Sequence, residues 1–123
     1  RSGFADLPPA DREVERAFWY TARLARSQRD EWFAAPGLMK QAGSLETLGD
    51  RPLIVVTAAR EALEGWLPLQ GGLARLSSNS AHRVVPDASH ESLVRTPANL
   101  GLVNQAIQDV VEAVRMSAPV RRS

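Results

Sequence analysis

His90 and Glu61 are the two residues of this 123-residue sequence whose types and positions best suit proton-transfer chemistry. Each lies in a polar turn that follows an apolar stretch of the chain. Histidine changes charge near neutral pH, and a carboxylate bound to its Nδ1–H fixes the tautomer and stabilises the imidazolium. The pair therefore predicts a general base, His90, oriented by Glu61. Glu64 is the alternative acid, and Asp87 is a more distant competitor.

The segments that carry these two residues have the pattern of two parallel strands joined by a helix. Residues 53–56 form an unbroken aliphatic and β-branched run, which is typical of a parallel strand covered on both faces. Residues 66–76 repeat large apolar side chains at helical spacing, and residues 83–86 contain a second, shorter strand. In open parallel sheets, catalytic groups gather beyond the carboxyl ends of the strands. We therefore expect the turns of Glu61 and His90 to meet there.

Helices are expected on both sides of this unit. Asp11 is a candidate N-cap for a helix whose apolar stripe runs to Ala25, and a second helix is bent or interrupted at Pro36–Gly37. After His90, Thr96 and Pro97 have the pattern of an N-cap and a first helical residue. The expected class is α/β, with three divisions along the chain: N-terminal helices (1–51), a strand–helix–strand–helix core (52–116), and a polar tail that frays (117–123).

Three stretches together resemble the C-terminal part of the α/β-hydrolase superfamily. Pro52–Glu61 (PLIVVTAARE) is similar to the strand and turn that carry the family's acid, and His82–His90 (HRVVPDASH) to its last strand and histidine turn. The helix from Pro97 resembles the family's C-terminal helix, and residues 1–51 would be cap or connecting helices. In these enzymes the chain order is Ser, then Asp or Glu, then His. The resemblance implies hydrolysis of a small ester-like or related acyl substrate, with His90 as base and Glu61 as acid.

The nucleophile-bearing half of such an enzyme is absent from this sequence. No Gly-x-Ser-x-Gly motif occurs, and Ser77, Ser78 and Ser80 are expected at the end of the sheet opposite the site. The nucleophile, Ser or Asp, is therefore left open. Because triad members act as a unit, we expect this chain to be catalytically inactive by itself.

Composition argues against several other classes of protein. The net charge of +1, with no nucleic-acid-binding motif, gives no reason to expect a nucleic-acid or membrane partner. No apolar run approaches the ~20 residues of a membrane span, and the absence of cysteine excludes disulfide and thiolate chemistry. His82, expected on the surface, and His90 lie at opposite ends of one strand, so a shared metal site is not expected. No cofactor is expected either, since the sequence has no Gly-rich loop of the kind that binds phosphate. The expected location is the cytoplasm.

The alternative hypothesis is a non-catalytic module, either a small α/β interaction protein or a relic of a hydrolase. Two parallel strands leave both sheet edges unpaired, so a missing part of the same protein or another chain is expected to supply a neighbouring strand. A homo-oligomer formed through strand edges satisfies that need. The sequence begins at Arg1 without Met, as expected of a fragment of a longer protein and also of Met removal or tag cleavage.

Overall fold

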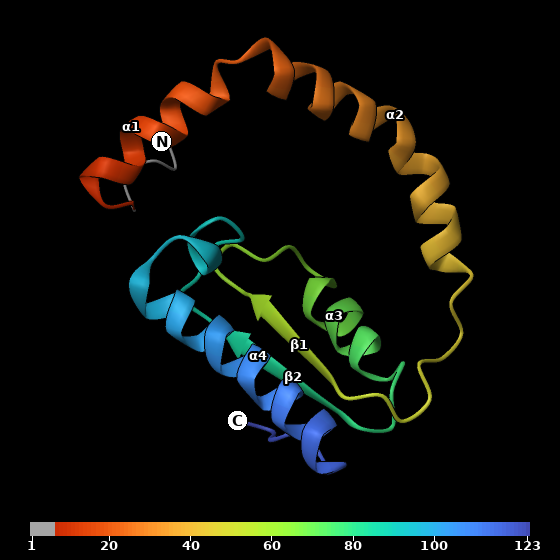
Figure 1. Cartoon of the computed structure of the whole chain (residues 1–123). Helices are drawn as coiled ribbons and strands as arrows, with labels where there is room; N and C mark the ends of the chain where they lie inside the picture. Colours follow the sequence, from red (N-terminus) through yellow and green to blue (C-terminus); the bar gives the residue numbers. More distant parts are fainter. Residues whose placement is uncertain (1–6) are drawn as a thin grey trace. The chain divides into compact units, whose positions relative to one another are not determined.

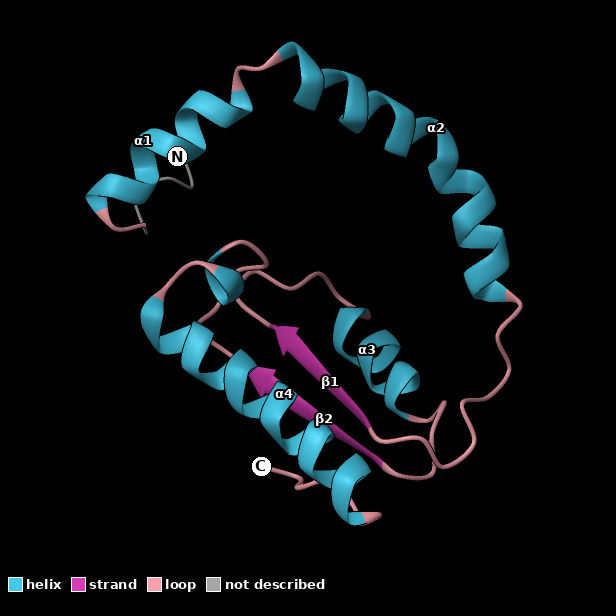
Figure 2. Ribbon diagram, in the orientation of Figure 1, coloured by secondary structure: helices cyan, strands magenta, loops and turns pink. Residues whose placement is uncertain are grey.

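The computed structural model describes residues 7–123, which form two units with a boundary between Glu46 and Thr47. The first unit contains two helices, and the second contains the two strands and the remaining helices (Figures 1 and 2). The mixed α/β class predicted from the sequence is confirmed in this coarse form.

The first unit consists of α1 (Pro9–Trp19) and α2 (Ala22–Gly43). The predicted continuous stripe to Ala25 is wrong, because the chain leaves the helix at Tyr20 and Thr21 caps a new one. The Thr21 hydroxyl accepts a hydrogen bond from the Leu24 N–H at 3.2 Å, which satisfies an otherwise unpaired donor of the first turn. Pro36 lies inside α2 and does not end it. Neither helix contains a buried residue.

The second unit is built on a two-stranded parallel sheet. Its elements follow one another as β1 (Leu53–Ala58), α3 (Trp66–Ala74), β2 (Ser80–Val85), the 3-10 helix η2 (Ser92–Val94) and α4 (Pro97–Met116). Leu53 pairs with Ser80 at one end of the sheet, and Ala58 pairs with Val85 at the other. The predicted strand–helix–strand–helix order and the parallel pairing are therefore confirmed.

One helix covers each face of the sheet. On the α3 face, the hydroxyl of Thr57 lies within hydrogen-bonding distance of Gln70. On the α4 face, Arg83 binds Asp109, and Ile54 packs against the cluster that contains Ala113. Figure 2 shows α4 passing over the strands. Helices on both faces explain why β1 is apolar at every position but Thr57 instead of alternating.

The C-terminal tail is anchored beside β2, so the prediction that residues 117–123 fray is wrong. The side-chain amide of Asn79 donates to the Ala118 carbonyl at 3.2 Å and accepts from the Val120 N–H at 2.8 Å. Arg83 donates to the carbonyl of Arg121 at 2.7 Å, and Val120 is 7% exposed. The tail thus lies along the outer side of β2 (Figure 1).

Within the second unit, no strand pairs with the other edge of the sheet, on β1. The Leu53 N–H donates to the Asn79 carbonyl and the Ala59 N–H to the Val85 carbonyl, so the odd-numbered residues of β1 direct their backbone groups to β2. Because these directions alternate along a strand, the N–H and C=O groups of Ile54, Val56 and Ala58 point away from β2. Within residues 7–123, no backbone hydrogen bond outside the β1–β2 ladder reaches these three residues.

Candidate functional site

The two predicted catalytic turns are joined through their backbones at the carboxyl end of the sheet. The Arg60 N–H, next to Glu61, donates to the carbonyl of Ala88 at 2.9 Å. Ala88 is fully buried, at 0% exposure, two residues before His90. The expectation that adjacent parallel strands bring these turns together therefore matches the observed geometry.

The turn of His90 is held by hydrogen bonds between the two serines that flank it. The Ser89 N–H donates to the Ser92 hydroxyl at 2.9 Å, and the Ser92 N–H donates to the Ser89 hydroxyl at 3.0 Å. The side chains of Thr96 and Asn99, from the start of α4, bind the Ser92 carbonyl at 3.0 and 3.1 Å. The backbone of the turn is fixed in this way, whereas the His90 side chain is exposed.

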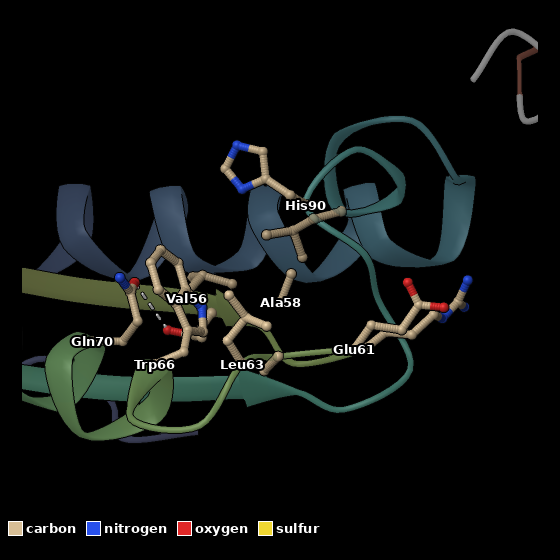
Figure 3. A pocket seen from close by; sticks show the side chains of 11 residues that line it. Val56, Ala58, Glu61, Leu63, Trp66, Gln70 and His90 are labelled. Carbon is tan, nitrogen blue, oxygen red and sulfur yellow. Dashed lines mark hydrogen bonds between the residues drawn. The ribbon is translucent and has the colours of Figure 1, made fainter. Parts of the chain in front are cut away.

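The carboxylate of Glu61 does not contact the imidazole of His90. Glu61 is exposed and has a left-handed backbone conformation, with φ of 58°. Figure 3 shows that the two side chains do not point toward one another. Glu64 and Asp87, the other candidate acids, are also exposed, and neither lines the depression beside His90. The structure thus brings the two turns together but leaves their side chains apart.

An open, largely apolar depression of about 460 Å³ lies between the two turns and the free edge of β1. Residues of β1, the acid turn, the first turns of α3 and the histidine turn all line it, among them Val56, Ala58, Glu61, Leu63, Trp66 and His90 (Figure 3). Its volume is in the range of small-ligand pockets, which are mostly apolar with a few placed polar groups. The depression therefore offers an apolar surface with the His90 residue at its rim.

A buried polar cluster under α3 was missed by the sequence reasoning. Thr57 is 1% exposed, and its hydroxyl lies 2.8 Å from Nε2 of His82 and 3.4 Å from Oε1 of Gln70. The expected surface position of His82 is therefore wrong, because the α3 face of β2 is partly covered. The one sequence signal was a threonine inside an apolar strand, but the strand register needed to pair it with His82 was unknown.

A second polar cluster joins β2 to α4. Asp109 is 3% exposed and accepts hydrogen bonds from Arg83 at 2.6 Å and from Gln105 at 3.0 Å. The hydrogen bond from Arg83, followed by that from Gln105, holds the pKa of the Asp109 carboxyl below its usual range. Since Arg83 also binds the Arg121 carbonyl, this cluster serves to hold the helix and the tail on the sheet.

Neither a group of metal-ligating side chains nor the three serines next to β2 accompanies the two turns in the part of the chain that the structure describes. Among residues 7–123, no three His, Cys, Asp or Glu side chains are grouped so that they could hold a metal ion. Ser77 and Ser78 precede β2 and Ser80 begins it, so these serines lie at the opposite end of the strand from His90. In the same described region, no helix is both long enough and apolar enough to cross a bilayer.

Comparison of the chain with protein-family models, with curated proteins and with solved structures gives no match.

Proposed function

We propose that this chain is the C-terminal part of an α/β-hydrolase-like enzyme acting on esters or related acyl compounds. His90 would be the general base and Glu61 the acid that orients it. The observation that carries the proposal is the hydrogen bond between the Arg60 N–H and the Ala88 carbonyl, which joins the two turns beyond adjacent parallel strands. The apolar depression between those turns offers a place for an acyl substrate.

In this mechanism, His90 takes the proton of a nucleophile supplied by the missing half and later returns it to the leaving group. Glu61 would bind the other ring nitrogen and stabilise the imidazolium. Both side chains are exposed and free to change rotamer, and the mechanism requires them to meet when the nucleophile-bearing half is present. The nucleophile and the oxyanion hole must come from residues outside this sequence, and no cofactor takes part.

The test is ester hydrolysis by the polypeptide extended upstream to include a Gly-x-Ser-x-Gly strand–turn–helix. With p-nitrophenyl acetate as substrate, His90→Ala should lower kcat by about 10³-fold or more, because the members of a triad act as a unit. Glu61→Gln should also impair kcat, whereas the matched change Glu64→Gln should be mild. The reverse order of the two glutamates would assign the acid to Glu64. Unchanged turnover in His90→Ala would contradict the proposal.

A second candidate function is favoured by the open edge of β1. A chain with an unpaired, apolar strand edge can act as a non-catalytic module that associates through that edge. Extension upstream discriminates between the two functions, because a hydrolase requires the nucleophile motif and an interaction module does not.

A further inference from the structure

The free edge of β1 has the features of a binding surface for another strand. Ile54, Val56 and Ala58 direct outward backbone donors and acceptors that have no partner among residues 7–123, while α3 and α4 already cover the two faces of the sheet. The apolar depression runs along this edge, since its lining includes Val56 and Ala58. Leu63 and Trp66 border the same depression and are 82% and 41% exposed. An added strand would therefore gain both hydrogen bonds and apolar contacts.

Nothing within β1 prevents such pairing. Soluble proteins protect exposed edges with charged residues, prolines, bulges or a covering segment. The six residues of β1, LIVVTA, contain none of these devices, and the strand pairs with β2 in unbroken register. On the opposite edge of the sheet, by contrast, the C-terminal tail is anchored through Asn79.

The β1 edges of two copies of this chain can pair with one another when the two strands run antiparallel. A twofold axis at Val56 places Val56 opposite Val56 of the second copy, and Ile54 opposite Ala58. All three residues then exchange N–H···O=C bonds with the partner, since each directs both groups outward. The same axis brings Arg51, before the strand, to the end where Glu61 of the second copy lies. Both residues are exposed, and they carry opposite charges.

We propose that two copies of this chain pair through their β1 edges, antiparallel about Val56, to form a continuous four-stranded sheet. This inference does not rest on the hydrolase proposal. It has a consequence for that proposal, however, because a strand supplied by a nucleophile-bearing half would occupy the same edge. The homodimer and the completed enzyme are then mutually exclusive.

The first experiment measures the mass of the 123-residue chain by light scattering and sedimentation over a wide range of concentration. The wild-type chain should be a dimer that dissociates on dilution. Val56→Pro removes an outward N–H and should give a monomer, while the matched change Val84→Pro removes an outward N–H on the β2 edge and should leave the dimer intact. Amide hydrogen exchange should show concentration-dependent protection at Ile54, Val56 and Ala58.

Charge reversal at exposed positions gives a test that does not depend on the folding of a proline variant. R51E and E61R should each weaken the dimer by about tenfold, because the twofold axis repeats the contact and turns attraction into repulsion. The double variant should recover the wild-type affinity. Mixing the two single variants should also restore association, since their reversed charges are complementary to one another.

Three results would overturn the proposal. The first is a chain that stays monomeric at high concentration with freely exchanging amides in β1, which would leave the edge for a strand of another polypeptide. The second is a dimer that Val84→Pro dissociates and Val56→Pro does not. The third is a dimer whose affinity is indifferent to R51E, E61R and their mixture.

Discussion

Replacing Thr57 with valine should destabilise the second unit, because it removes a buried hydroxyl at almost constant volume. The hydroxyl is 1% exposed, and its bond to His82 Nε2 is 2.8 Å long. Its bond to Gln70, at 3.4 Å, is at the limit of a useful hydrogen bond and contributes little. Water cannot readily replace a group so deeply buried, so the imidazole nitrogen loses its partner.

The expected loss is about 1–2 kcal/mol in the free energy of unfolding. A typical hydrogen bond contributes ~0.5–1.5 kcal/mol net, and an unsatisfied buried partner costs ~1–3 kcal/mol. Because His82 is partly exposed, its unsatisfied nitrogen costs less than a fully buried one, and the expected loss lies in the lower part of the ~1–3 kcal/mol range. A double-mutant cycle with His82→Ala should give a coupling energy of about 1 kcal/mol between the two side chains.

Urea denaturation followed by tryptophan fluorescence measures this loss. Trp19 and Trp32 lie in the first unit and Trp66 in the second, so a background with the first two changed to phenylalanine reports the second unit alone. Thr57→Ser is the matched control, since it keeps the hydroxyl and loses only a methyl group. A coupling energy below ~0.3 kcal/mol would refute the reasoning, because two independent sites give values of that size. A valine variant as stable as wild type would refute it as well.

Two further predictions concern the polar contact of α4 and the buried alanine of the histidine turn. Because Arg83 lowers the folded-state pKa of Asp109, that carboxylate stabilises the fold above its unfolded pKa of about 4 and loses this effect as the pH falls through the lowered value. Asp109→Asn should be less stable than wild type at neutral pH and should lose less of its stability in acid. Urea midpoints at several pH values measure this, with the exposed Glu64→Gln as the control. Ala88→Val should cost about 1–3 kcal/mol, because a site at 0% exposure has no room for two methyl groups, and urea denaturation would measure it. An unchanged acid response in Asp109→Asn, or a neutral Ala88→Val, would contradict the packing described above.

The sequence predicted the parts of this structure that local pattern determines. The apolar run of β1, the proline start of α4 and the order of strands and helices follow from periodicity and from turn chemistry. The break at Tyr20 was missed because the stripe continues across it, although Thr21 is a favourable N-cap residue. Of the two alternatives at Pro36, an interruption is wrong, since a long helix can tolerate the loss of one hydrogen bond at a solvent-exposed position.

The remaining features depend on contacts between residues far apart in the chain. His82 is partly buried because α3 lies over the face of the sheet that carries it. The C-terminal tail is anchored because the side chain of Asn79, in the loop before β2, binds the backbone of the tail. For the candidate site, sequence reasoning placed the turns of Glu61 and His90 side by side. It could not give the side-chain directions, because exposed side chains are not fixed by the strand pattern that positions their backbones.

The hydrolase proposal and the homodimer proposal both place a third strand beside β1, but they differ in the direction of that strand. The depression that would hold a substrate is bordered by the same β1 edge that would pair with another strand. A parallel strand, continuing the sheet, ends at the rim where His90 lies and can present a nucleophile there. An antiparallel copy of this chain presents Arg51 at that rim instead, beside Glu61, and gives a sheet without a nucleophile. Under the two proposals taken together, the catalytic role proposed for His90 depends on which polypeptide occupies the edge of β1 and in which direction that polypeptide runs.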